Sequence, residues 1–313
     1  MTNSFSIKHR PSSLDEVVGN AAIKKVLRPM IESNKYSHIF LEGITGSGKT
    51  TLAYIIASSF GAQSIDDVNC VHFSSINDMR EKINSLQMTS FLKKRVLILD
   101  EIHRLSAQSQ DVLLKPLEGG VASDVLIIAC STTTEKLSPM LLDRFKRLKV
   151  TPLSDKEAVQ LIERIEKAEG LQVPKWKKAL IVDKCDGIPR RILSGLEKVV
   201  GIEDEKEVIF LLDLNELDGE NEDVLDLFKN LLASASWAKV KEIIRKVVKS
   251  VSPEGIRVGM LNIISARIMS DYGTPEEKIR LAKVYETIIN PISFPEKSNI
   301  IYYIFKIHLM LKV

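Results

Sequence analysis

The segment Gly43-Ile-Thr-Gly-Ser-Gly-Lys-Thr50 places three glycines, a lysine and several hydroxyl groups within eight residues. Glycines let backbone N–H groups close around phosphate oxygens, and the positive end of a following helix favours the same charge. The segment follows the apolar residues 39–41 and opens a helical pattern, which is the context of the Walker A motif. A glycine-rich turn with a chance lysine is the alternative, and this context disfavours it. We therefore predict an ATP site.

Two side chains of this motif have specific predicted tasks. Lys49 would reach the β- and γ-phosphates of ATP, and the Thr50 hydroxyl would ligate Mg²⁺. The other residues of the motif that we expect to bind the nucleotide are Gly43, Thr45, Gly46, Ser47, Gly48 and Thr51.

A second motif, Val96-Leu-Ile-Leu-Asp-Glu101, ends an apolar run in two carboxylates, as a Walker B motif does. Ligands of open α/β sheets bind at the carboxyl ends of the strands. Asp100 is therefore predicted to hold Mg²⁺, directly or through water. Glu101 is predicted to orient and deprotonate the attacking water. A strand that ends in two solvated acids is the alternative, and it is the weaker one beside a Walker A motif.

A small polar residue after the next apolar run, residues 125–129, could hold the attacking water between Glu101 and the γ-phosphate. Thr132 is the predicted residue, and the sequence does not separate it from Ser131. Hydroxyls are common in loops, so a purely structural role is the alternative for both.

Short apolar runs alternate with amphipathic stretches through the first half of the chain. This order is typical of an α/β fold with a parallel sheet flanked by helices, the P-loop class. Strands are predicted at 39–41, 71–73, 96–99, 125–129 and 147–150. Helices are predicted at 21–33, 50–60, 76–87 and 106–117.

The strand signal mostly ends near Pro152, and helical patterns follow. Ser154-Asp-Lys-Glu157 is a capping box that should open a helix, and Pro253, Pro275 and Pro295 suit the first turn of three later helices. We predict an α/β domain at 1–152, a helical lid at 153–203, an acidic boundary at 201–222 and a helical collar at 220–313. The helices expected in the lid and collar are 154–168, 174–184, 189–200, 222–234, 238–251, 253–270, 275–289 and 295–311.

Composition excludes several classes of protein. The 313 residues carry 44 basic and 41 acidic side chains, so nucleic acid would have to bind a local patch rather than bulk positive charge. Three widely spaced cysteines make no zinc or redox motif and suit a reducing compartment. We find no signal peptide and no bilayer-spanning run, so a cytoplasmic protein without a membrane partner is expected.

The order of these motifs resembles AAA+ ATPases of the clamp-loader family, which includes the gamma subunit of bacterial DNA polymerase III, replication factor C small subunits and phage equivalents. The resemblance covers the first two-thirds of the chain. Its segments are Lys8-His-Arg-Pro-Ser-Ser-Leu-Asp-Glu-Val-Val-Gly19, Asp100-Glu-Ile-His-Arg-Leu-Ser106, Asp111-Val-Leu-Leu-Lys-Pro-Leu-Glu118, Leu141-Leu-Asp-Arg-Phe145 and Gly187-Ile-Pro-Arg-Arg-Ile-Leu-Ser-Gly-Leu-Glu197.

The resemblance implies roles for residues outside the two Walker motifs. Arg10, Pro11 and Val18 would contact the adenine end of ATP. Arg144 would be an arginine finger that reaches the ATP of a neighbouring subunit, and Arg190 would contact the γ-phosphate in its own subunit. A surface arginine in a local salt bridge is the alternative for Arg144.

Departures from the family pattern affect some of these roles. Asp143 and Phe145 replace the serine and cysteine that flank the finger in the family, and Arg191 competes with Arg190. A zinc-binding insert of the gamma subunit is missing. The helix opening at Ser75–Lys82 is a candidate for DNA phosphate contact, with a solvated helix as the alternative. For His103 we expect a structural role beside the site.

Two functions follow from the resemblance. The first is an ATP-hydrolysing, Mg²⁺-dependent subunit of a clamp loader. It would assemble with other subunits into a homo- or hetero-oligomer, with a pentamer expected, and load a sliding clamp on primer–template DNA. The second is a DNA motor such as a Holliday-junction branch-migration helicase, which shares Gly187-Ile-Pro-Arg190 but should end in a winged helix. The helical pattern of 222–313 favours the first, and its apolar surplus predicts oligomerisation there unless a compact bundle buries it.

Overall fold

A computed structural model describes residues 4–71, 76–88, 94–120, 124–213, 222–232, 235–269, 274–290 and 297–312. The chain divides into two compact units. The first unit contains Met1–Gln172 and Asp186–Ser194, and the second contains Val173–Cys185 and Gly195–Val313. Each unit has its own core, and we describe them separately.

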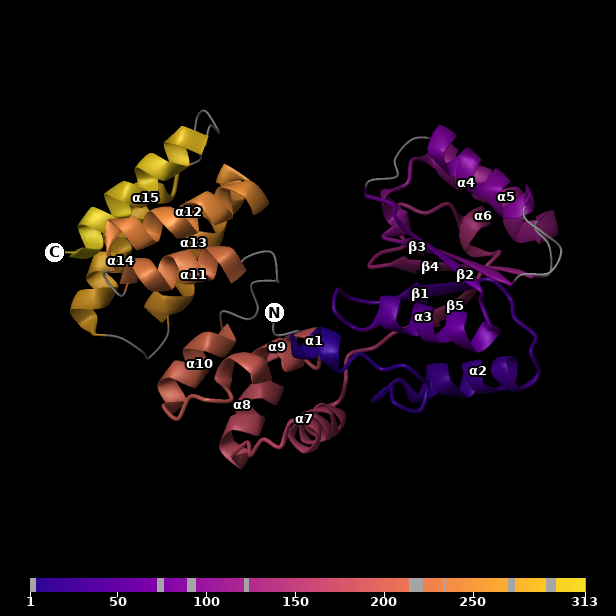
Figure 1. The fold of residues 1–313 in the computed structure, drawn as a ribbon, viewed down its shortest axis with the longest axis horizontal. Coiled ribbons are helices and arrows are strands. Elements are labelled where there is room, and N and C mark those ends of the chain that lie inside the picture. The colour runs from indigo at the N-terminus through magenta and orange to yellow at the C-terminus, as the bar shows by residue number, and fades with distance from the viewer. Residues whose placement is uncertain are drawn as a thin grey trace. The chain divides into compact units, whose positions relative to one another are not determined.

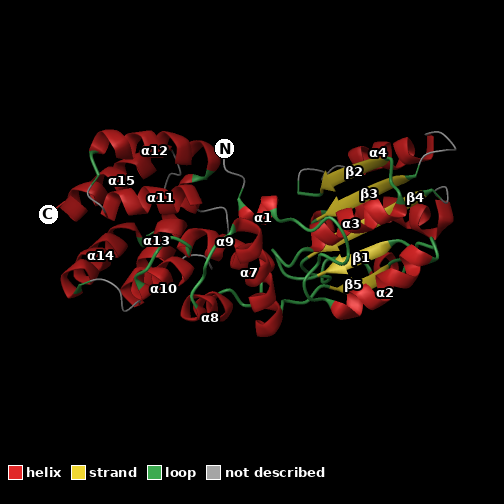
Figure 2. Ribbon diagram, turned by 60° about the horizontal axis from the view of Figure 1, so that its bottom comes forward, coloured by secondary structure: helices red, strands yellow, loops and turns green. Residues whose placement is uncertain are grey.

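A parallel five-stranded sheet forms the centre of the first unit, as predicted (Figure 2). The strand order is β2-β3-β4-β1-β5. This order places β3, β4 and β1 side by side, so the residues at their carboxyl ends meet at one edge of the sheet. The strands are β1 (Ile39–Glu42), β2 (Ser64–Asn69), β3 (Arg95–Asp100), β4 (Val125–Ser131) and β5 (Lys146–Lys149).

Side chains of each central strand alternate between two hydrophobic cores, because successive residues of a strand point to opposite faces. On β3, Val96 and Ile98 join one core, and Leu97 and Leu99 join the other. The first core is covered by α2 (Ala21–Glu32) and α3 (Lys49–Phe60), and the second by α4 (Ile76–Met88), α5 (Ala107–Lys115) and α6 (Pro139–Leu142) (Figure 1). Burial on both faces explains why the central strands are continuous apolar runs.

The prediction of a strand at 71–73 is wrong. The strand in this part of the chain, β2, runs from Ser64 to Asn69. Val71 lies in a turn with 48% of its surface exposed, and 72–73 lie outside the described residues. β2 is an edge strand and carries polar residues instead of an apolar run. One of these is Asp66, whose carboxylate charge is balanced by two ion pairs. Lys82 Nζ lies 2.7 Å from Asp66 Oδ1, and Arg95 Nη2 lies 2.9 Å from Asp66 Oδ2.

Helix α7 (Asp155–Glu169) begins with the predicted capping box. The Ser154 backbone N–H donates to Glu157 Oε2 at 2.9 Å. At the other end of α7, Glu169 accepts hydrogen bonds from Lys8, the last residue of the short helix α1 (Phe5–Lys8), and from His9, which follows it. The N-terminal segment is thereby fixed to α7 within the first unit.

The second unit is helical throughout its described residues. A single core joins the helices of its C-terminal part. The predicted helices are present with small shifts of their ends, but α10 occupies part of the acidic segment that we predicted as a boundary. Pro253 and Pro275 begin their helices as expected, and Pro295 lies outside the described residues. The helices are α8 (Lys175–Lys184), α10 (Glu205–Asp213), α11 (Glu222–Leu232), α12 (Trp237–Ser250), α13 (Pro253–Met269), α14 (Pro275–Ile288) and α15 (Lys297–Lys312), with α9 (Pro189–Val199) divided between the units.

Among the helices that the structure describes, none is both long and apolar enough to cross a membrane.

Candidate active site

The loop between β1 and α3 requires glycine at two positions. Gly46 and Gly48 have φ angles of 79° and 99°, which side chains with a Cβ rarely adopt. A Cβ on Gly46 would also lie 2.9 Å from a methyl carbon of Ile188. The loop therefore has its backbone N–H groups free of side-chain cover just before the first turn of α3, which begins at Lys49.

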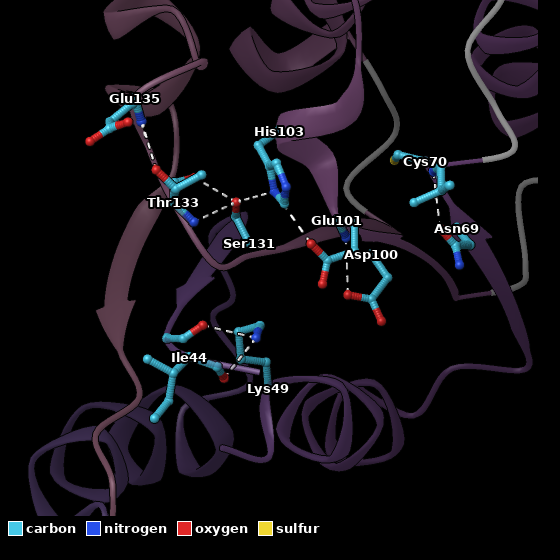
Figure 3. Close-up of polar contacts among 12 residues, drawn as sticks. Ile44, Lys49, Asn69, Cys70, Asp100, Glu101, His103, Ser131, Thr133 and Glu135 are labelled. Carbon is cyan, nitrogen blue, oxygen red and sulfur yellow. Dashed lines mark hydrogen bonds and ion pairs between the residues drawn. The ribbon is translucent and has the colours of Figure 1, made fainter. Parts of the chain in front are cut away.

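Lys49 contacts its own loop. Its Nζ donates to the carbonyl oxygens of Gly43 at 2.9 Å and Ile44 at 3.1 Å (Figure 3). Burial lowers the pKa of Lys49, and the nearby carboxylates of Glu101 and Asp100 act in the opposite direction. An ammonium that is 5% exposed and, within the described residues, hydrogen-bonded to two carbonyl oxygens is well placed to gain from a phosphate oxygen.

A buried hydroxyl in the same loop also fits a nucleotide. Ser47 is 4% exposed, and its Oγ has no hydrogen-bond partner within the described chain. Buried polar atoms are rarely left unsatisfied, so an absent ligand is a direct explanation. The orphaned Oγ and the Lys49 ammonium together match an anionic phosphate group.

The two predicted Mg²⁺ ligands lie in contact. Thr50 Oγ1 donates to Asp100 Oδ2 at 2.9 Å, although the residues are 50 positions apart. The other carboxylate oxygen of Asp100 accepts the backbone N–H of Glu101 at 3.0 Å. A hydroxyl and a carboxylate are the hard oxygen donors that Mg²⁺ prefers, so this pair fits the ion.

Glu101 begins a short 3-10 turn, η1 (Ile102–Arg104), and adopts a left-handed conformation with φ 54° and ψ 42°. Such a conformation is uncommon for a residue other than glycine and occurs often at functional sites. His103 Nδ1 lies 3.4 Å from Glu101 Oε2 and 2.8 Å from Ser131 Oγ (Figure 3). Burial lowers the pKa of His103. The structural role beside the site that we expected for His103 stays a prediction, and no local sequence pattern indicated its contact with Glu101.

Ser131, at the end of β4, contacts both the histidine beside Glu101 and the phosphate-binding loop. Besides its bond to His103, its backbone oxygen accepts the N–H of Gly43 at 3.1 Å. Ser131 is fully buried, whereas Thr132 is half-buried. Of the two hydroxyls that the sequence left open, the structure connects Ser131 to the catalytic segment, and the role of Thr132 stays a prediction.

A cavity of about 450 Å³ in the first unit brings most of the predicted residues together. As far as the chain is described, Gly43, Thr132 and Arg144 are not in its lining. The predicted residues that do line it are Arg10, Pro11, Val18, Thr45, Gly46, Ser47, Gly48, Lys49, Thr50, Thr51, Asp100, Glu101 and Arg190. The sequence had not indicated the apolar residues that share this lining, which include Val17, Leu153, Leu161 and Leu193.

The two competing arginines of α9 have different surroundings. Arg190 lines the cavity, and its backbone N–H donates to the carbonyl oxygen of Gly46 at 3.3 Å. Arg191 instead pairs with Asp186 at 2.9 Å. This difference favours Arg190 as the residue that contacts the nucleotide.

Arg144 lies after α6, and its guanidinium pairs with Glu118 of its own chain. Glu118 belongs to η2 (Pro116–Gly120), which follows α5. The buried Gln110 on α5, which the sequence did not single out, ties this region together. Its amide donates to Lys136 O at 2.9 Å, and its carbonyl accepts the N–H of Ser138 at 2.9 Å. Gln110 thereby fixes the segment that leads into α6. A glutamine in a helical pattern gives no signal of such contacts.

The candidate DNA-contacting helix is α4. Lys82 is engaged by Asp66, and Arg80 is exposed. Ser75, the first residue of the predicted segment, lies outside the described residues. Contact with DNA stays a prediction.

Comparison with known proteins agrees with this geometry. Residues 39–153 match the family described as "ATPase family associated with various cellular activities (AAA)". Residues 39–153 therefore correspond to an AAA ATPase domain.

Relatives of known name extend the similarity beyond this domain. The chain is 27% identical to a replication factor C small subunit from Natronomonas pharaonis, over 66% of this chain and 65% of the relative. It is 34% identical to ATPase WRNIP1 from Dictyostelium discoideum, over 65% of this chain and 24% of that protein. A variant of RuvB from Thermotoga maritima has a similar structure, with 26% identity, a TM-score of 0.55, and coverage of 72% of this chain and 80% of the other. The match to the archaeal relative thus spans just under two-thirds of that protein's length.

Proposed function

We propose that this protein is an ATPase subunit of a sliding-clamp loader, which uses ATP binding and hydrolysis to open a clamp and place it on primer–template DNA. The carrying observation is that Lys49, Asp100, Glu101 and Arg190 converge on one cavity in a chain whose described C-terminal part is helical. The similarity to replication factor C small subunits supports the same reading.

The geometry supports a specific division of labour. Lys49 and the loop N–H groups bind the phosphates of ATP, and Arg10, Pro11 and Val18 line the part of the cavity expected to hold adenine. Glu101 accepts a proton from the water that attacks the γ-phosphorus. Thr50 and Asp100 hold Mg²⁺, which neutralises phosphate charge when bound.

In the proposed function, each ATP site is completed by a residue of a neighbouring subunit. Arg144 lies outside its own chain's cavity lining, which suits a residue that acts on a neighbour's ATP. The last helix, α15, exposes a row of apolar side chains at helical spacing, and monomers rarely expose such rows. The row consists of Ile301, Tyr302, Phe305 and Leu309, with 38%, 62%, 39% and 50% of their surfaces exposed. We propose that it contacts other subunits of the oligomer.

A DNA motor is the second candidate, because the fold of RuvB is similar and Gly187-Ile-Pro-Arg190 is typical of that family. The described residues between 222 and 312 are helical and contain no strand, whereas a winged helix would need a β-hairpin. This observation favours the clamp loader.

A pull-down with candidate sliding clamps tests the proposal. We expect the full-length protein to retain a clamp with ATP and to lose it without ATP. Lys49→Ala, which removes the phosphate-binding ammonium, serves as the matched control and should fail under both conditions. Unwinding of a four-way DNA junction, without ATP-dependent clamp binding, would favour the motor instead.

A further inference from the structure

We propose that His103 is a positioning residue for ATP hydrolysis, which holds the carboxylate of Glu101 through its Nδ1–H and links it to Ser131 at the end of β4. The proposal rests on the role of Glu101 as general base in the proposed function. It concerns a side chain that lies between two strand ends, with Glu101 on one side and Ser131 on the other (Figure 3).

The hydrogen bonds of Ser131 determine which ring nitrogen of His103 carries the proton. Ser131 Oγ donates its only hydrogen to the carbonyl oxygen of Thr133 at 2.6 Å, and it accepts the Thr133 N–H at 3.2 Å. A hydroxyl has one donor and two acceptor sites. Its 2.8 Å contact with His103 Nδ1 must therefore use the remaining acceptor site, so Nδ1 bears the hydrogen.

The same nitrogen also lies beside the carboxylate of Glu101. Glu101 Oε2 lies 3.4 Å from Nδ1, longer than an ideal hydrogen bond but close enough to attract this N–H. Because Nδ1 is a donor, the contact is favourable with a neutral ring. His103 is 8% exposed, so the ring has little freedom to turn away.

The backbone supports this orientation from the other side. The left-handed conformation of Glu101 starts the turn η1, which is closed by Arg104 N–H to Glu101 O at 2.9 Å. The turn brings His103 back beside the carboxylate two residues earlier. The backbone conformation of Glu101 and the side chain of His103 therefore act together to orient the carboxylate of Glu101.

Ser131 connects this arrangement to the phosphate-binding loop. It pairs with Glu42 in the register of β1 and β4, and its carbonyl oxygen accepts the N–H of Gly43 at 3.1 Å. If the phosphate-binding loop moves when phosphate binds, Ser131 would therefore transmit the movement to His103. His103 contacts both Ser131 and Glu101 and so joins them directly.

Three substitutions test the position of the donor. In asparagine the amide nitrogen is two bonds from Cβ, as Nδ1 is, whereas in glutamine it is three bonds away, as Nε2 is. With the assembled complex, we expect His103→Ala to lower kcat roughly 100-fold, the cost of an ångström-scale misplacement, with KM for ATP unchanged. His103→Asn should recover most of the loss, and His103→Gln should not. Equal rates for the Asn and Gln variants, or an unchanged kcat for His103→Ala, would overturn the proposal.

A readout without turnover covers the case in which these variants fold poorly. In the wild-type protein, a long-range ¹H–¹⁵N correlation spectrum of the histidine rings distinguishes the two neutral tautomers. We expect His103 to carry its hydrogen on Nδ1, and a hydrogen on Nε2 would refute the proposal. Glu101→Gln separates this inference from its premise: if that variant hydrolyses ATP normally, the role of Glu101 fails, whereas a dead Glu101→Gln beside a fully active His103→Ala refutes only the role of His103.

Discussion

Arg144 and Glu118 form an ion pair within one chain, with Arg144 Nε 3.0 Å from Glu118 Oε1. Arg144 Nη2 also donates to Glu118 Oε1, and a third contact joins Arg144 Nη1 to the carbonyl oxygen of Met140. The residue proposed to act in a neighbour's site is thus held by its own subunit, and its release must precede its action there.

Exposure to solvent limits the strength of the ion pair between Arg144 and Glu118. Glu118 is 57% exposed, and exposed ion pairs contribute about 0.2–1 kcal/mol, which is a factor of about 5 at most. We expect Glu118→Gln to raise the ATP turnover of the assembled complex by no more than that factor, and the gain to shrink at high salt. Glu135→Gln, which removes the same charge from another exposed residue, should have no effect. Lower turnover in Glu118→Gln would show that Glu118 instead guides the arginine to its target.

Arg144→Ala should leave the nucleotide affinity of the isolated subunit unchanged, because Arg144 does not line the described cavity. In the assembled complex it should lower turnover by about 10³-fold or more, as arginine fingers do. Mixing Arg144→Ala with Lys49→Ala subunits should restore part of the activity, since each variant supplies the group that the other lacks. Unchanged turnover in Arg144→Ala together with no rescue would exclude the finger.

Glu101→Gln and Lys49→Ala should fail at different steps. Glu101→Gln removes the base but leaves Thr50, Asp100 and the loop intact, so ATP should bind and remain unhydrolysed. Lys49→Ala removes the buried ammonium from the loop and should weaken binding itself. Fluorescent-nucleotide titration and phosphate release measure the two steps separately. If Glu101→Gln hydrolyses ATP at the wild-type rate, the assignment of the Walker B motif is wrong.

The attachment of the N-terminal segment to α7 should depend on pH. Hydrogen bonds from Lys8 and His9 lower the pKa of Glu169 from its usual value of 4.5. A carboxyl group with a lowered pKa stabilises the fold above its usual value, and this stabilisation is lost as pH falls through the lowered one. The difference in Tm between wild type and Glu169→Gln should therefore be constant near neutral pH and shrink below 4.5. The exposed Glu32→Gln serves as control, and a difference that grows on acidification would contradict the ion pair.

The apolar row on α15 should control assembly. We expect Tyr302→Glu or Leu309→Glu to shift the full-length protein from oligomer to monomer in light scattering, because a charge at a buried subunit contact is costly. Met269→Glu is the matched control, since Met269 is 84% exposed and belongs to α13 instead of α15. Oligomers that survive both α15 substitutions would place the contacts elsewhere.

Central strands and the two Walker motifs were predictable because each depends on local sequence. The apolar runs of β1, β3 and β4 end at the candidate site. Helix α3 begins at Lys49, within the Walker A motif. β2 was misplaced because an edge strand needs no apolar run. The pairs His103–Ser131 and Arg144–Glu118 join residues 28 and 26 positions apart. Such pairs depend on how the turns η1 and η2 face the ends of β4 and α6, and no local pattern reports that.

The two hydrogen bonds from Lys49 to its own loop have a kinetic consequence. They keep the loop in shape before any nucleotide arrives, so the entropy of ordering it is lost during folding and not on encounter. Arrival of a nucleotide then becomes an exchange of partners at one ammonium group, carbonyl oxygen for phosphate oxygen. Differences in affinity among nucleotides should therefore appear mainly as differences in how long each one stays, while their rates of arrival remain similar.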